Sequence, residues 1–226
     1  MTVGPHTVRL GLASRGNVYT AAYIGLKEGF FKTRDLDVQL SYHGVSGVVD
    51  ALDEAAIDMG FTVFPDNVMR WVSSPKTRAV VIASANARAV NERWLLAGIM
   101  TTREYLASNR AQVLSFMKGM LESVHLMWTD HEKGARYMVE DQGATRDIGI
   151  PQFRAVTAPL NLFRQVLGKM PQRMELTEEH IANALAFLSM VHGELRDVAP
   201  AVFYDSTVLE ELGREGFVDR LWTANL

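Results

Sequence analysis

The sequence predicts an α/β fold in which a parallel-rich sheet is flanked by helices and followed by further helices. Two patterns predict it. In the first 85 residues, short apolar runs alternate with segments of helical periodicity, and after Arg103 the apolar spacing is helical only. Strands separated by short helices pair in parallel through right-handed crossovers, so the first part is expected to form the sheet.

Four strands are expected in those first 85 residues, with helices between them. The strands are short apolar or alternating runs, at Val8–Leu12, Asp37–Ser41, Ile57–Val63 and Ala79–Ala83. The last run is apolar throughout, which is typical of a strand covered on both faces. Apolar residues three and four positions apart predict the helices, from Tyr19 to about Gly29, after Gly44, and from Asp66 to Val72.

The remainder of the chain is expected to be helical. Thr101–Glu104 matches the Ser/Thr-x-x-Glu capping box and predicts a helix start. A stripe of apolar residues then predicts one long helix whose methionines pack in the core: Val113, Phe116, Met117, Met120, Leu121, Val124 and Met127. Thr177 is the expected N-cap of a helix to about His192, with Leu176 and Ile181 as a hydrophobic pair around it, and Ser206–Leu212 is a last expected helix.

Composition excludes several classes of function. The chain is 48% hydrophobic and 22% charged, which is ordinary for a globular protein. Lys and Arg number 23 against 26 Asp and Glu, so there is no basic surplus for nucleic acid or anionic lipid. The absence of cysteine removes disulfides, thiolate catalysis and iron–sulfur clusters. No run of about 18 apolar residues occurs, so no direct membrane insertion is expected.

Two motifs carry a resemblance to a known family. Tyr23–Phe31 reads Tyr-Ile-Gly-Leu-Lys-Glu-Gly-Phe-Phe, and Ala56–Phe61 reads Ala-Ile-Asp-Met-Gly-Phe. Together with Val8–Leu12 and Leu36–Leu40, they resemble the opening of ABC-transporter substrate-binding proteins of the nitrate, sulfonate and taurine type, a family grouped with the thiamine-pyrimidine synthases. The resemblance implies a periplasmic-binding-protein-like (type II) fold that binds a small, anionic organic solute for uptake through an ABC permease.

Members of that family have two α/β lobes around a ligand cleft, and this chain departs from the pattern. The fourth strand runs through Asn86–Arg93 directly into Trp94–Ile99, which looks like the family's return strand into the first lobe. Most of a second lobe, a domain of about 100 residues, is therefore expected to be missing. Residues 1–100 are expected to form the first lobe, and residues 101–226 a helical region that packs on it.

The candidate ligand site lies in three loops that follow strands, because ligands of open parallel sheets bind beyond the carboxyl ends of the strands. Glycines and free N–H groups at helix starts favour an anion there. The candidates are Ser14, Asn17 and Tyr19 in the first loop, His43, Gly44, Ser46 and Gly47 in the second, and Phe64 and Asp66 in the third. As alternatives, Ser14, Ser46 and Asp66 are helix N-caps, Tyr19 and Phe64 pack, and His43 and the glycines only form turns.

Enzyme interpretations are less well supported, and no catalytic residue, metal or cofactor is expected. The loop at His43–Gly47 lacks the Gly-x-Ser-x-Gly pattern, because Val48 stands where the second glycine is needed. His125 and His131 are too far apart in sequence to share one helix face as metal ligands. A thiamine-precursor synthase stays open but is disfavoured by the absence of cysteine. A self-associating module, a homo-oligomer, is the other alternative.

The compartment is left open by the sequence. The family resemblance implies a periplasmic or other extracytoplasmic location, whereas the N-terminal residues of the chain as given carry no basic stretch followed by an apolar run. A cytoplasmic location therefore remains the alternative.

Overall fold

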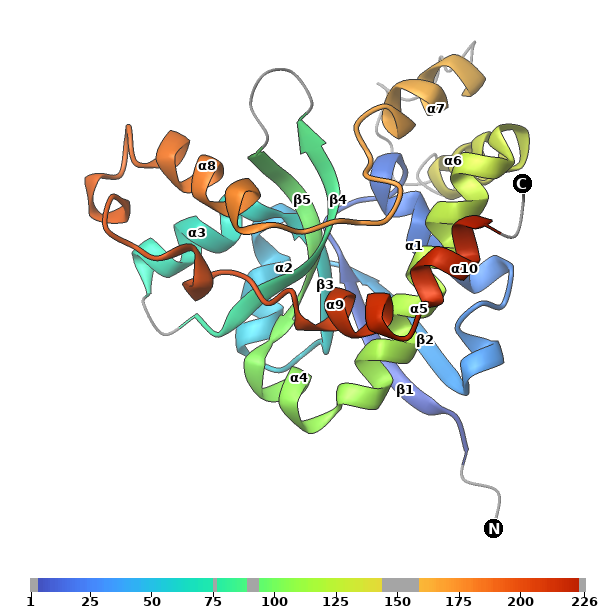
Figure 1. Ribbon diagram of the computed structural model, residues 1–226, viewed down its shortest axis with the longest axis horizontal. Helices are drawn as coiled ribbons and strands as arrows, with labels where there is room; N and C mark the ends of the chain where they lie inside the picture. Colours follow the sequence, from blue (N-terminus) through green and yellow to red (C-terminus); the bar gives the residue numbers. More distant parts are fainter. Residues whose placement is uncertain (1–3, 75–76, 89–93, 144–158, 224–226) are drawn as a thin grey trace.

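The computed structural model describes residues 4–74, 77–88, 94–143 and 159–223, and its centre is a single five-stranded sheet (Figure 1). The strand order is β2-β1-β3-β5-β4, and β1 pairs in parallel with both β2 and β3. The strands are β1 (His6–Leu12), β2 (Leu36–Tyr42), β3 (Met59–Val63), β4 (Ala79–Arg88) and β5 (Trp94–Thr102). The predicted α/β sheet is confirmed, and it is mixed, because two of its four strand pairings are parallel and two are antiparallel.

One part of the strand pairing differs from the expectation of parallel pairing throughout. β4 does not pair with β3, because β5 lies between them and runs antiparallel to both. β5 contains the return strand expected at 94–99 and lies within the sheet, between β3 and β4. The expected loss of most of a second lobe stays a prediction. Of the segment expected to lead from the fourth strand directly into the return strand, residues 89–93 lie outside the described residues.

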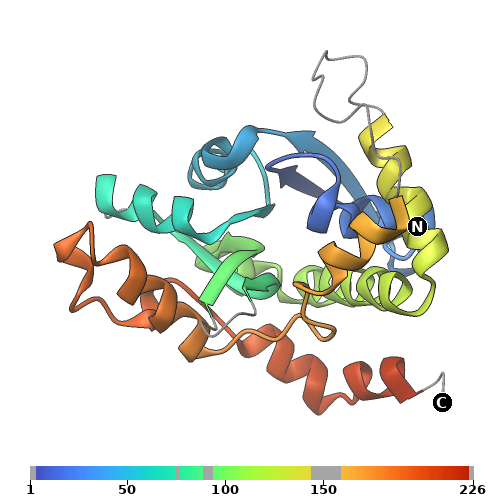
Figure 2. The ribbon, with the colours of Figure 1, turned by 90° about the horizontal axis from the view of Figure 1, so that it is seen from above.

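Helices cover both faces of the sheet. Figure 2 shows α2 and α5 on opposite sides of it, and α2 packs directly on β1 and β3. The helices are α1 (Thr20–Lys27), α2 (Gly44–Asp53), α3 (Phe64–Ser73), α4 (Arg103–Ser108), α5 (Arg110–Thr129), α6 (His131–Gly143), α7 (Pro159–Leu167), α8 (Glu178–Leu188), α9 (Thr207–Arg214) and α10 (Phe217–Thr223). None of these described helices has both the length and the apolar character needed to cross a bilayer.

The helices of the C-terminal part pack on the sheet and on the N-terminal helix α1. α8 contacts β5, α9 contacts β4, and α5 lies against α1. All seven residues of the apolar stripe predicted in α5 are buried, which confirms that its methionines belong to the core. The described residues before and after residue 100 share one hydrophobic core. The expected division into a first lobe and a helical region at residue 100 stays a prediction.

The C-terminal segment also covers the outer edge of β4. The Val81 N–H donates to the Phe203 carbonyl at 2.8 Å, and the Val81 carbonyl accepts from the Asp205 N–H at 2.8 Å. Further along the strand, the Ser84 N–H donates to the Met174 carbonyl at 3.0 Å. Because an uncovered edge strand invites pairing with another chain, these bonds protect the sheet on that side.

Two helix ends differ from the predictions. The N-cap of α4 is Thr102, whose hydroxyl accepts from the Tyr105 N–H at 3.1 Å, whereas the Thr101 hydroxyl is buried and donates to the Asp58 carbonyl at 2.8 Å. α8 ends at Leu188, short of His192. Its predicted N-cap Thr177 is confirmed, with His180 rather than an acidic residue as its reciprocal partner.

The space around two helical glycines predicts opposite effects of replacing each of them with alanine. A Cβ on Gly119 of α5 would lie 2.6 Å from Cδ1 of the buried Phe31, whereas a Cβ on Gly213 of α9 meets open space. We expect Gly119→Ala to lower the free energy of unfolding by about 1–3 kcal/mol through overpacking. Gly213→Ala should raise it by about 0.5–1 kcal/mol through helix propensity. Urea unfolding of both variants tests this, and equal effects would contradict it.

Candidate functional site

The three predicted loops lie at one edge of the sheet, which we call the rim and define as residues 13–19, 42–47 and 63–66. Leu12, the last residue of β1, pairs with Tyr42 at the end of β2 and with Phe61 near the end of β3. Because these strands are parallel, the segments that follow them start side by side. Val63 pairs with Ala97 of β5, so the β4–β5 end of the sheet extends past the same edge (Figure 1).

The first loop is held by a bond to a distant helix. The Gly16 N–H donates to Oδ2 of Asp141 at 2.7 Å, and Asp141 of α6 is only 1% exposed. Burial raises the pKa of the Asp141 carboxyl. Gly16 and Asn17 have φ of 72° and 59°, and a Cβ on Gly16 would collide with the Gln142 side chain. This bond fixes the loop so that Ser14 and Asn17 are exposed at the rim.

Arg15 in the same loop was not among the predicted site residues. Its charge and its position in a loop that follows a strand could have identified it as a candidate. Its guanidinium lies over the Tyr42 ring, 4.0 Å from the ring centroid. Its Nη1 atom is 3.9 Å from Oδ1 of Asp141. Asp141 had no such signal, since it lies 125 residues from Gly16 in the sequence.

The second segment leads into α2, whose first turn has no side-chain cap. His43 is the N-cap position; its N–H donates to the Leu12 carbonyl at 3.1 Å, and its Nε2 lies 2.7 Å from the Ser41 hydroxyl. Gly44 has a φ of 72°, and Gly44 and Ser46 are exposed, while Gly47 lies in the helix against the His43 side chain. The first N–H groups of a helix lack partners within it, so those of α2 face the rim without a side-chain acceptor.

The third segment begins α3, and its aromatic neighbours are buried. Phe64 is fully buried, with its ring edge-on to Phe203 at 5.9 Å, and Tyr19 is 7% exposed, edge-on to Phe61 at 4.7 Å. Both rings thus contact protein, as the packing alternative predicts. Burial and the nearby Asp66 carboxylate raise the pKa of Tyr19 to about 12.

Asp66 is half-buried in the first turn of α3, and burial raises the pKa of its carboxyl. The alternative that Ser14, Ser46 and Asp66 are N-caps is wrong. The N-caps of η1 (Asn17–Tyr19), α2 and α3 are Gly16, His43 and Val63. These three polar side chains are therefore not used to cap the helices beside them.

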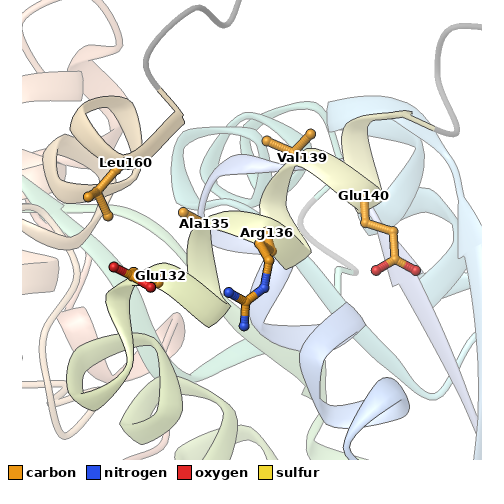
Figure 3. Close-up of a pocket in the computed structure, with 6 residues that line it drawn as sticks. All are labelled: Glu132, Ala135, Arg136, Val139, Glu140 and Leu160. Atoms are coloured by element: carbon orange, nitrogen blue, oxygen red, sulfur yellow. The ribbon is translucent and has the colours of Figure 1, made fainter.

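Other hollows lie away from the rim. Figure 3 shows a pocket of about 530 Å³ between α6 and α7, lined by Glu132, Ala135, Arg136, Val139, Glu140 and Leu160. It contains none of the predicted site residues. Within the described part of the chain, no group of three or more His, Cys, Asp and Glu side chains is placed to hold a metal ion.

Comparison with solved structures identifies the class of fold. A protein of Bordetella bronchiseptica RB50 superposes with a TM-score of 0.69 at 9% identity, over 93% of this chain and 98% of that one. The periplasmic aliphatic sulphonate-binding protein SsuA of Escherichia coli matches with a TM-score of 0.62 at 9% identity, over 90% and 93% of the two chains. The fold is the periplasmic-binding-protein fold, and the fold predicted from the resemblance is confirmed.

A third solved structure of similar fold is named for nitrate instead of a sulphonate. The periplasmic nitrate-binding protein NrtA of Synechocystis PCC 6803 matches with a TM-score of 0.63 at 10% identity, over 93% of this chain and 89% of that one. No family model and no curated protein sequence matches this chain. At identities near 10%, the likeness is one of fold, and the ligand of this chain has to be argued from its own residues.

The buried carboxyl behind the first loop predicts a pH dependence of stability. Asp141→Asn keeps an oxygen that accepts from the Gly16 N–H but removes the ionisable group. The folded-state pKa of Asp141 is raised above its unfolded value, so the folded protein binds the proton more tightly and stability falls as pH rises through the unfolded pKa of about 3.9. As the pH rises above that value, the wild type should therefore lose stability relative to Asp141→Asn.

Urea unfolding at several pH values above about 3.9 measures this difference. Parallel stability curves for the wild type and Asp141→Asn would contradict the prediction.

Proposed function

We propose that the rim binds a small anionic organic solute and does not transform it. The observation that carries this proposal is the uncapped first turn of α2, which opens onto the rim between the exposed Ser14 and Asn17 of the first loop and Asp66 of α3. The solute-binding fold supports it, because the named neighbours are a sulphonate-binding and a nitrate-binding protein. The ligand-binding roles of the rim residues rest on this argument.

The electrostatics of α2 favour an anion. The N-terminus of a helix carries about half a positive charge, and its free N–H groups point at any ligand placed there. In α2 these groups belong to Gly44, Val45 and Ser46, all of which are exposed. Gly44 has no side chain to keep a ligand from the backbone. Ser14 and Asn17 add a hydroxyl and an amide that can donate to the same oxyanion.

A non-catalytic role fits the chemistry at the rim. The Ser41–His43 pair brings a hydroxyl and an imidazole within 2.7 Å, but the hydroxyl sits on edge strand β2 rather than on a strand-to-helix turn. We infer that the protein serves solute uptake by an ABC permease and acts outside the cytoplasm; the location is supported by two proteins of the same fold that are named as periplasmic. The permease, the location and self-association stay predictions.

The openness of the rim predicts weak affinity. Among the described residues there is a single sheet, so the ligand would be covered from one side only. Half-solvated hydrogen bonds compete with water, whereas two-lobed binding proteins close around their ligand. We expect dissociation constants of about 1 mM for short-chain sulfonates or carboxylates. Calorimetry with sulfonates, nitrate, pyrimidines and amino acids tests this, with sedimentation run beside it.

Two results would count against that prediction. No binding by any anion up to about 10 mM would remove the proposed function. Submicromolar binding by a monomer would refute the argument from one-sided cover.

A pair of substitutions at Ser46 tests the anion site itself. Ser46 is exposed in the first turn of α2. Ser46→Glu places a carboxylate where the helix dipole stabilises it, so the fold should be as stable as the wild type or more stable. The same carboxylate should repel an anion and weaken binding at least tenfold. Ser46→Gln, of matched size but neutral, should bind within about threefold of the wild type.

Calorimetry and urea unfolding are measured on both Ser46 variants. If Ser46→Glu and Ser46→Gln bind the anion equally well, the first turn of α2 is not the binding site.

A further inference from the structure

The two outermost strands of the sheet, β2 and β4, differ in how their free edges are covered (Figure 1). The edge of β4 bonds the C-terminal segment, whereas among the described residues β2 pairs with β1 alone. An edge strand is a template for a further strand unless basic side chains, a proline, a bulge or another element block it. β2 contains no lysine, arginine or proline, and its register with β1 is continuous over its whole length. The edge of β2 therefore has the features of a pairing surface.

The bonds at the two ends of the β1–β2 ladder show which backbone groups of β2 point outward. The His6 N–H donates to the Asp35 carbonyl at 2.8 Å, and the His43 N–H donates to the Leu12 carbonyl at 3.1 Å. In a parallel ladder, alternate residues of a strand bond to the same neighbour, so the odd-numbered residues of β2 bond to β1. The even-numbered residues direct their N–H and C=O groups away from β1.

Val38 and Leu40 carry the open backbone groups of this edge. The Leu36 N–H donates to the Phe31 carbonyl at 3.2 Å, but the outward N–H and C=O groups of Val38 and Leu40 have no hydrogen-bond partner within the described ranges. The Val38 side chain is 6% exposed, and Leu40 packs against the core. What the edge offers to a partner is thus mainly its backbone, which is the part that an added strand bonds.

A second copy of β2 matches this edge. In an antiparallel arrangement centred on Gln39, Val38 of one copy lies opposite Leu40 of the second copy, and the two residues exchange both of their backbone hydrogen bonds. This register pairs β2 along its whole length, and it is unchanged when the two copies are exchanged, as a two-fold interface requires. Apolar side chains then face apolar side chains on the face of the sheet that carries Val38 and Leu40.

The single charged residue of β2, Asp37, favours the same register. It lies opposite Ser41 of the second copy when the pairing is centred on Gln39. The Ser41 hydroxyl is 2.7 Å from Nε2 of His43, and a hydroxyl both donates and accepts, so it can bond the imidazole and the carboxylate together. A pairing in parallel and in register, or one centred on Asp37, would instead place the two Asp37 carboxylates face to face, which is destabilising.

We propose that the edge of β2 is a homodimer interface, in which two copies of the chain join their sheets antiparallel about a two-fold axis at Gln39. The rims of the two copies then lie at opposite ends of the joined strands, about 20 Å apart. The inference goes beyond the proposed function and does not depend on it. An interface built around one strand from each copy is small, so the dimer dissociation constant should be about 10–100 μM.

Charges at Gln39 test the two-fold arrangement in the full chain. Gln39 is exposed and lies opposite itself, so Gln39→Lys and Gln39→Glu each place two like charges face to face. At low salt, each variant alone should associate about fivefold more weakly than the wild type. An equimolar mixture should associate within about twofold of the wild type or more tightly, because each lysine then faces a glutamate. Sedimentation from about 5 to 500 μM protein measures these constants.

A second pair of variants tests the backbone bonds. Leu40→Pro removes an N–H that the β1–β2 ladder does not use, and such positions of an edge strand tolerate proline. Leu40→Ala also shortens the side chain but retains the N–H, so it is the matched control. Leu40→Pro should associate about tenfold more weakly than Leu40→Ala, because the dimer loses the bond twice.

The outcomes decide the inference separately from the proposed function, since none of these measurements includes a solute. A wild type that is monomeric up to about 500 μM would overturn it. Association of Gln39→Lys at the wild-type strength would assign the contact to another surface, and a mixture no stronger than either Gln39 variant alone would refute the two-fold register. Circular dichroism and urea unfolding accompany each variant. The Gln39 variants alone decide the inference should Leu40→Pro not fold.

Discussion

The parallel pairing of β1 with both β2 and β3 is the constraint on which the rest of the structure depends. Parallel strands need crossover helices, and each crossover starts at the same edge of the sheet. Three segments with glycine, hydroxyl and amide groups are thereby brought together, although they are well separated along the chain. The helix starts that follow them set the sign of the local field, because their N-termini point toward that edge.

The antiparallel strand β5 connects β4 to the rest of the sheet. It enters between β3 and β4 and pairs with both, so that β4 does not become a detached strand. The open side of β4 is then covered by backbone bonds from Phe203, Asp205 and Met174. The C-terminal part of the chain thus supplies edge protection that a sheet of this size needs.

Local patterns predicted most of the fold, since strand and helix periodicity depend on neighbours in the sequence. The first three strands and the buried stripe of α5 were found in this way. The cap of α4 was misplaced by one residue because Thr101 and Thr102 are both good caps, and only the contact of Thr101 with the Asp58 carbonyl decides between them. The return strand needed the family resemblance, as periodicity alone does not give the direction of a strand.

The site was predicted less completely because its geometry depends on contacts between distant parts of the chain. The loops and their helix starts could be placed from turn residues, yet the choice between a ligand wall and core packing for Phe64 depends on its contact with the distant Phe203. The same holds for Arg15, whose orientation is set by Tyr42 and by a carboxylate from α6.

That carboxylate links the two halves of the protein in one structural unit. Asp141 is buried at the end of α6 and bonds the Gly16 N–H in the first loop, so the position of the loop depends on the packing of α6 against α1 and α5. A loop with two successive residues at positive φ would otherwise have several conformations of similar energy. The helical C-terminal region therefore does more than cover apolar surface, because it contacts the first loop of the rim through the Asp141–Gly16 bond, through the Arg15–Asp141 ion pair and through the packing of α7 on η1.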